Sequence, residues 1–281
     1  MTVQLDKTGK VSAGAKPLQA KAAPRAVQRL SSVTTAVRLL KMFTEDEAEI
    51  GVTSLARRLG VAKSTVYRLA STLVAEGMLE QNPETERYRL GIALFGLGAL
   101  VRQRMNLSNE ARPYIFDLRD ATNETVHLAV LDKAEIIYVY DLESTQAIRM
   151  SANLGARKPS LCTAEGLAIL AFQSPDFVDS VIAEGFRPRT PKTDTDPAVL
   201  RQRLSQVRQQ GYAREDEQSE LGMRSIAAPV RDSTGQVIGA VGMAGPLQRL
   251  SDETLTKYAP LVVNTANAIS LRLGYKAAAH Y

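Results

Sequence analysis

Residues 52–69 restrict the fold of this chain more than any other segment does. Two stretches with helical spacing, 54–59 and 63–76, lie close together, and apolar side chains recur through them at Leu55, Leu59, Val61, Val66 and Leu69. Two closely crossing helices need a small residue, which Ala56 supplies. The connecting turn needs a residue that tolerates a positive φ, which Gly60 supplies. The segment therefore predicts a helix-turn-helix, with Thr53 capping the first helix and Lys63 or Ser64 starting the second.

The surface of this segment is expected to be positively charged. Residues 53–75 contain no Asp or Glu, and the whole net charge of +5 lies in residues 1–90, which hold 14 Lys and Arg against 9 Asp and Glu. A basic unit joined to a neutral one is expected where one domain meets a polyanion. With the start of the second helix in a DNA major groove, the candidate contacts are Thr53, Arg57, Lys63, Ser64, Thr65, Tyr67, Arg68 and Arg87. The alternative is a helix pair that only packs and leaves a solvated basic face.

The segments around the helix pair suggest how the chain is divided. Two strand candidates, 78–80 and 87–90, fit a wing, and Leu94, Leu97 and Leu100 place one apolar face on a linker helix that is also a candidate dimer contact. The first residues lack periodicity and are rich in Ala, Lys and Gln. We expect a flexible basic tail at 1–26, a winged helix-turn-helix domain at 27–90, the linker helix at 91–106 and a further domain at 107–276.

The domain at 107–276 is expected to have an α+β fold. Strand-like runs occur at 125–131, 135–140, 147–152, 223–230 and 237–243. Helical patterns occur at 107–122, 163–172, 176–184, 196–210 and 251–273. Strands and helices in this irregular order are typical of a mainly antiparallel sheet.

Several classes of protein are disfavoured. One cysteine, Cys162, gives no internal disulfide, and two histidines leave little for a metal site. The longest uncharged apolar run has 12 residues, against about 20 for a membrane span. Cys162 and His127 could form a nucleophile–base pair, but no orienting group or oxyanion hole is evident. We therefore expect a cytoplasmic protein that is not an enzyme, with no cofactor, no metal and no membrane partner.

The sequence resembles the IclR family of bacterial transcriptional regulators over residues 30–275. The resemblance is carried by segments in a specific order, namely 55–69, Tyr88-Arg89-Leu90-Gly91, 124–130, 211–213, 222–230 and Ala244-Gly245-Pro246. It implies a winged helix-turn-helix, a linker helix and a ligand-sensing domain, assembled as homodimers or dimers of dimers.

The resemblance also implies an effector site in the second domain. The positions that match the family's ligand contacts are Gly155, Ala156, Glu215, Met223, Ser225, Gly242 and Ala244. Family members that sense small organic acids tend to have serines where this chain has Gly242 and Ala244. Loss of these two hydrogen-bond donors adds volume to the pocket, which favours a bulkier, partly apolar effector such as an aromatic or hydroxylated acid. The alternative is that the pocket has collapsed.

These observations predict a regulator of a catabolic operon that binds an inverted-repeat operator in double-stranded DNA and responds to a small organic or aromatic acid. Two other functions remain open at this point: a small-acid hydrolase that uses Cys162 and His127, and an architectural DNA-binding protein without an effector. Repression and activation are both compatible with the sequence.

Overall fold

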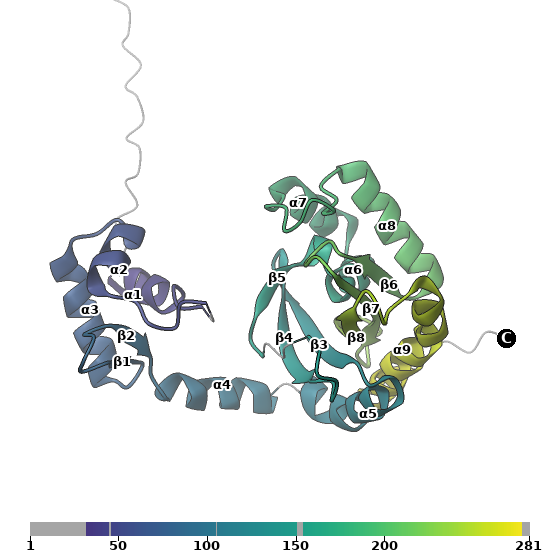
Figure 1. Cartoon of the computed structure of the whole chain (residues 1–281), viewed down its shortest axis with the longest axis horizontal. Coiled ribbons are helices and arrows are strands. Elements are labelled where there is room, and N and C mark those ends of the chain that lie inside the picture. Colours follow the sequence, from purple (N-terminus) through teal and green to yellow (C-terminus); the bar gives the residue numbers. More distant parts are fainter. Residues whose placement is uncertain (1–31, 45, 105, 151–153, 277–281) are drawn as a thin grey trace, which may run out of the picture. The chain divides into compact units, whose positions relative to one another are not determined.

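The computed structural model describes residues 32–44, 46–104, 106–150 and 154–276 (Figure 1). The chain divides into two compact units between Phe95 and Gly96. The tail predicted at 1–26 lies outside the described residues, and the domain boundaries at 27, 91 and 107 stay predictions.

The first unit contains three helices and a two-stranded hairpin. Its elements are α1 (Ser32–Leu40), α2 (Val52–Leu59), α3 (Lys63–Ala75), β1 (Leu79–Gln81) and β2 (Tyr88–Leu90). Their apolar faces form one core, which is made of Leu39, Ile50, Leu55, Ala56, Val66, Leu69, Ala70, Leu79 and Tyr88. Because a unit this small has little surface to bury, each of these side chains matters for its stability.

The predicted helix-turn-helix is confirmed, but its first cap is wrong. Gly60 ends α2 in the left-handed region at φ 67°, and its N–H bonds to the carbonyl of Ala56. Helix α3 begins at Lys63, as predicted. Helix α2, however, begins at Val52 with Gly51 as its N-cap, and Thr53 lies in its first turn. The half-buried Val52 packs against the core, which explains why the helix starts before the threonine.

The predicted wing is the hairpin of β1 and β2. Strand β1 is displaced by one residue from the expected 78–80, and β2 is one residue shorter than the expected 87–90. Glu80 lies opposite Arg89 in this antiparallel pair, and Arg89 Nε donates to Glu80 Oε2 over 2.9 Å. Ile50 extends the pairing, because its backbone exchanges hydrogen bonds of 2.9 and 3.0 Å with Tyr88. The wing is therefore fixed to the segment before α2.

Helix α4 spans Ala93–Arg104, so it begins two residues later than the predicted 91–106, and residue 105 lies outside the described residues. Gly91 stays outside it, since its N–H bonds to Met78 O and a Cβ at this position would lie 2.1 Å from Gly77 O. Leu97 and Leu100 are 48% and 59% exposed. The apolar face expected on this helix is thus uncovered in the single chain.

The second unit has an α+β fold, as predicted. Its helices are α5 (Asn106–Thr122), α6 (Ala164–Leu170), α7 (Pro175–Glu184), α8 (Pro197–Gln210) and α9 (Asp252–Arg272), with a short 3-10 turn, η1, at Ser160–Cys162. Its strands are β3 (Thr125–Asp132), β4 (Glu135–Leu142), β5 (Arg157–Pro159), β6 (Ala213–Asp216), β7 (Met223–Arg231) and β8 (Val237–Pro246).

One antiparallel sheet in the order β5-β4-β3-β8-β7-β6 separates two hydrophobic cores. Figure 1 shows α5 and α9 on one face of this sheet and α6, α7 and α8 on the other. Chain segments far apart in sequence meet at its centre, where Thr125 pairs with Ala244 and His127 with Gly242.

Two parts of the predicted sheet were wrong. Residues 147–150 are not in a strand, and 151–152 lie outside the described residues. Strand β5 occurs later, at Arg157–Pro159, and β6 was not predicted. Strand β6 was not predicted because three of its four side chains are charged. In the structure Ala213 and Glu215 are buried, and they alternate with the less buried Arg214 and Asp216.

Candidate functional site

The first unit presents most of the predicted DNA contacts at its surface. On α3 the buried Val66 and Leu69 face the core, whereas residues 63, 64, 67 and 68 are exposed. Tyr67 is 61% exposed. Of the predicted contacts only Thr65 is half-buried, and the exposed ones are Thr53, Arg57, Lys63, Ser64, Tyr67, Arg68 and Arg87.

The basic side chains of this unit fall into two groups. Arg58 pairs with Glu47 over 2.6 Å, and Arg89 pairs with Glu80 over 2.8 Å. The other predicted DNA contacts with a positive charge are Arg57, Lys63, Arg68 and Arg87. Within the residues that the structure describes, no carboxylate lies within 4 Å of any of these four side chains. An unpaired surface cation keeps its charge available for a phosphate or a guanine edge. The unit therefore offers a surface suited to a polyanion.

The second unit contains a cavity of about 240 Å³ beside the centre of the sheet. Three predicted effector contacts line it, namely Met223, Ser225 and Ala244. The strand order explains their proximity, because Ser225 of β7 lies directly opposite Ala244 of β8. The pocket is open in this structure, so the expectation of a collapsed pocket does not apply to it.

The other predicted effector residues lie behind the cavity wall. Gly155 and Ala156 do not line the cavity. Their backbones form hydrogen bonds with the backbone of Tyr138, and Tyr138 lines the cavity. A Cβ on Gly242 would lie 2.7 Å from Glu165 Oε1 and 2.8 Å from Ala227 Cβ. The missing side chain at Gly242 thus makes room for the carboxyl group of Glu165, which fills the volume that we expected to enlarge the pocket.

Glu215 of β6 is buried beneath the pocket wall. Its carboxylate accepts a hydrogen bond from Ser225 Oγ over 3.0 Å and others from the backbone N–H groups of Gln218 and Ser219. Burial raises the pKa of this carboxyl to about 7, against the pull of these donors. Glu215 therefore orients Ser225 and the loop after β6 and does not itself line the cavity.

The raised pKa of Glu215 predicts a dependence of stability on pH. The folded chain holds this proton up to about pH 7, whereas the unfolded chain releases it near pH 4.3, so folding stability falls as pH rises through this window. We expect the wild-type chain to lose about 3 kcal/mol more than Glu215→Gln between about pH 4 and pH 8. Urea unfolding at both pH values measures this loss; parallel losses in the two proteins would contradict it.

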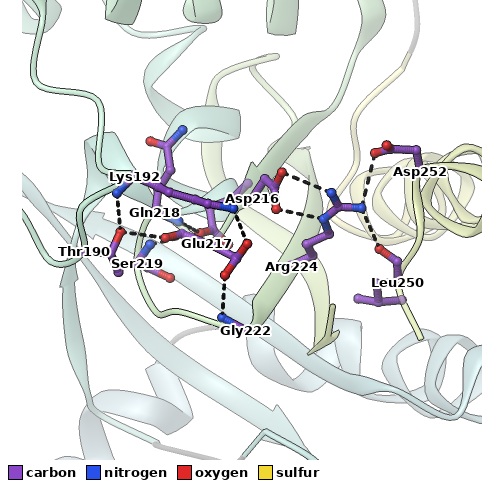
Figure 2. Close-up of polar contacts among 11 residues, drawn as sticks. Thr190, Lys192, Asp216, Glu217, Gln218, Ser219, Gly222, Arg224, Leu250 and Asp252 are labelled. Atoms are coloured by element: carbon purple, nitrogen blue, oxygen red, sulfur yellow. Dashed lines mark hydrogen bonds and ion pairs between the residues drawn. The ribbon is translucent and has the colours of Figure 1, made fainter. Parts of the chain in front are cut away.

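The loop that follows Glu215 is held by polar contacts on both sides, as Figure 2 shows. Thr190 Oγ1 donates to Glu217 O over 2.7 Å, and Gly222 N donates to Glu217 Oε2 over 2.9 Å. Arg224 joins Asp216 to Leu250 O, just before α9, and to the carboxylate of Asp252 at the start of α9. These contacts fix Ser219 and Glu220, which lie at the cavity.

Cys162 and His127 are not arranged as a nucleophile and its base. The Cys162 thiol is buried against Pro159 O at 3.6 Å, and burial raises its pKa to about 11. His127 directs Nδ1 to the carboxylate of Asp141. A thiol that stays protonated at neutral pH is a poor nucleophile, so the hydrolase alternative loses its chemical basis. Across the described ranges, no three His, Cys, Asp or Glu side chains cluster in a way that could hold a metal ion.

Several residues that line the cavity were not predicted from the sequence. His127 was considered only as a possible base for Cys162, yet it lines the cavity, as do Tyr138, Lys158, Thr163, Glu165 and Ser219. They come from β3, β4, β5, α6 and the loop after β6, and only the long-range register brings them together. For Glu165 the sequence offers one signal of a functional position, because it is the only acidic residue in the otherwise apolar stretch 164–171.

Two protein-family models match the chain. The one described as the IclR helix-turn-helix domain matches residues 32–83, and the one described as the bacterial transcriptional regulator IclR C-terminal matches residues 99–271. No helix in the described part of the chain has the length and apolar character that crossing a membrane requires.

Curated relatives are similar over most of their length. The HTH-type transcriptional regulator KdgR of Escherichia coli is 37% identical over 248 residues, which cover 88% of this chain and 94% of KdgR. The transcriptional repressor IclR of Escherichia coli is 31% identical over 264 residues, which cover 93% and 96% of the two chains. Both relatives are named as regulators of transcription, not as enzymes.

Solved structures show the same architecture. The IclR protein of Thermotoga maritima has a TM-score of 0.68 at 28% identity and covers 87% of this chain and 99% of its own. An IclR homologue from Microbacterium hydrocarbonoxydans, solved in complex with 4-hydroxybenzoate, has a TM-score of 0.75 at 27% identity, with 86% and 99% covered.

Proposed function

Because this chain belongs to the IclR family of bacterial transcriptional regulators, we propose that it controls a catabolic operon from the cytoplasm by binding an inverted-repeat operator. Its effector is a small organic or aromatic acid that binds in the second unit. The observation that carries this proposal is the exposed face of α3, whose Lys63 and Arg68 have no ion-pair partner within the described residues.

The DNA contacts follow from this face. Helix α3 enters the major groove with its N-terminal part, as recognition helices do. Lys63 and Arg68 contact phosphates or guanine, and Ser64, Thr65 and Tyr67 complete the surface. Thr53, Arg57 and Arg87 flank α3 and contact the backbone of the duplex. These contacts fix the register of the protein on its operator.

A second copy of the chain is needed to read an inverted repeat, and α4 supports such an assembly. Leu97 and Leu100 are exposed on one side of α4, and Phe95, which is 73% exposed, lies on the opposite side. Large apolar side chains that a single chain leaves exposed on several sides of one helix are expected to be covered by a partner. We propose a homodimer through this helix, or a dimer of dimers, with half-sites spaced by multiples of about 10 bp.

The effector site is the cavity lined by Met223, Ser225 and Ala244, with Glu215, Gly242, Gly155 and Ala156 forming its supporting wall. The relative that was solved with 4-hydroxybenzoate supports a small acid as ligand. Effector binding changes the operator affinity through two states of the dimer. Such coupling typically amounts to about 1–3 kcal/mol.

Selection of genomic fragments on the full chain, followed by footprinting, tests the proposal. We expect a protected inverted repeat upstream of a catabolic operon, with half-site centres about one or more helical turns apart. Uniform protection without sequence preference would instead favour an architectural DNA-binding protein. Protection of a single half-site by a monomer would contradict the proposed assembly.

A further inference from the structure

Helix α4 contains two glycines, Gly96 and Gly98, that the packing of the described residues does not require. A Cβ built at either position would have no packing neighbour within 4 Å among those residues. By contrast, a Cβ at Gly91, just before the helix, would lie 2.1 Å from Gly77 O. Neither Gly96 nor Gly98 has a positive φ. Close packing therefore explains Gly91, whereas neither packing nor backbone conformation explains the two glycines inside the helix.

The two glycines weaken α4 where it has no other support. After proline, glycine is the residue that favours a helix interior least, because it loses the most backbone freedom when it is ordered. A helix shorter than about 12–15 residues is marginal by itself and depends on packing against other elements. Helix α4 has 12 residues, and every residue from Phe95 to Leu100 is exposed. The middle of this helix is therefore a point at which the chain bends easily.

The position and the spacing of the glycines fit a hinge better than a contact surface. The first compact unit ends at Phe95 and the second begins at Gly96, so the weak point coincides with the boundary between them. Residues that form one face of a helix recur three or four positions apart. Gly96 and Gly98 are two positions apart and point about 200° away from each other. They therefore do not form one small face against which a second helix could pack closely.

We propose that Gly96 and Gly98 make α4 a hinge that sets which half-site spacings the chain can read in its operator. This inference rests on the proposed function and adds a determinant of specificity to it. One added base pair moves a half-site by about 3.4 Å and rotates it by about 34–36°. With a stiff linker the DNA has to deform to remove this mismatch, which costs free energy. A bend at the two glycines removes the mismatch within the protein.

Operators with altered spacing test the hinge. The probes are labelled duplexes that carry the footprinted operator, unchanged or with one base pair added to or removed from its spacer, and fluorescence anisotropy measures their binding to the full chain. The comparison is between wild type and the double variant Gly96→Ala with Gly98→Ala. We expect the altered spacing to cost wild type about fivefold or less and the double variant about tenfold or more, because only the variant has to deform the DNA. Equal losses in the two proteins would overturn the inference.

A further substitution separates flexibility from a packing role of the glycines. Ala99 is exposed in the same turn of α4, so adding Ala99→Gly to the double variant returns one glycine without restoring either original position. We expect this triple variant to regain part of the tolerance to altered spacing. Sedimentation velocity is expected to show the same assembly for all three proteins. Loss of assembly in the double variant, or no recovery in the triple variant, would show that the glycines act through contacts and would overturn the inference.

Hydrogen exchange tests the hinge without DNA. Amides of residues 97–100 are expected to exchange faster than those of the core-packed helix α3, since opening of an exposed helix costs little. The double variant is expected to slow their exchange by about 5- to 30-fold, because alanine is favoured over glycine in a helix at both positions. Protection of these amides in wild type as strong as in α3 would overturn the inference.

The outcomes for this inference and for the proposed function can be told apart. A wild-type chain that binds its operator at one spacing only is still a regulator, but one with a stiff linker, and this inference fails. A chain that protects no inverted repeat would refute the proposed function. In that case hydrogen exchange still decides whether α4 bends at its glycines.

Discussion

Arg68→Ala is expected to weaken operator binding by about 5- to 150-fold, which corresponds to about 1–3 kcal/mol for a lost base contact. Arg68 is exposed on α3, and no carboxylate competes for its guanidinium within the described residues. Fluorescence anisotropy with a labelled operator at fixed salt concentration measures the change. Lys63→Ala is expected to weaken binding as well, and to lower the dependence on salt if its partner is a phosphate.

The matched control is Arg201→Ala. Arg201 is exposed on α8 of the second unit and pairs with Asp179 over 2.8 Å, so this variant changes the net charge by the same amount away from the proposed DNA surface. We expect its operator affinity to stay within about twofold of wild type, since exposed ion pairs contribute little. Equal losses in Arg68→Ala and Arg201→Ala would show that net charge, and not the face of α3, governs binding.

Gly166→Ala is expected to destabilise the second unit by about 3 kcal/mol, the upper end of the usual cost of overpacking. A Cβ at Gly166 would lie 2.1 Å from Ser160 O and 2.4 Å from Ser160 Cα, and both are backbone atoms that cannot rotate away. Helix α6 would have to move off η1, and overpacking of this kind is among the most destabilising changes in a core. Because Glu165 precedes this glycine, effector binding is expected to weaken too. Urea unfolding followed by circular dichroism measures the loss.

Gly98→Ala is the matched control for this glycine. Gly98 lies in helix α4, and a Cβ there would meet nothing within 4 Å. Alanine is favoured over glycine in a helix by about 1 kcal/mol, so this variant should be as stable as wild type or slightly more stable. Comparable unfolding midpoints for Gly166→Ala and Gly98→Ala would contradict the close contact between α6 and η1.

The helix-turn-helix could be predicted from sequence because its signals are local. Gly60 must adopt a positive φ to end α2, and Ala56 is one of the small residues of the core that α2 and α3 share. Neither requirement depends on distant parts of the chain. The cap at Thr53 was wrong because the packing of Val52 against the core prevailed over the capping preference of a threonine side chain.

The proposed effector pocket could be predicted only in part because it depends on long-range pairing. Ser225 and Ala244 meet through the register of β7 and β8, which the resemblance to the family anticipated. Glu165 was missed because its position depends on the missing side chain of Gly242, which lies on a strand far from it in sequence. The absence of serines at Gly242 and Ala244 was interpreted as added pocket volume, whereas the buried carboxyl group of Glu165 occupies the space beside Gly242.

The operator affinity of the full chain, measured with and without a bound effector, tests the central claim most directly. The effector is the compound that calorimetry shows to bind, used at a concentration that saturates the chain. We predict that saturation changes the operator affinity by about 5- to 150-fold, in either direction. An operator affinity that stays the same when the pocket is demonstrably occupied would contradict the account of a ligand-responsive regulator.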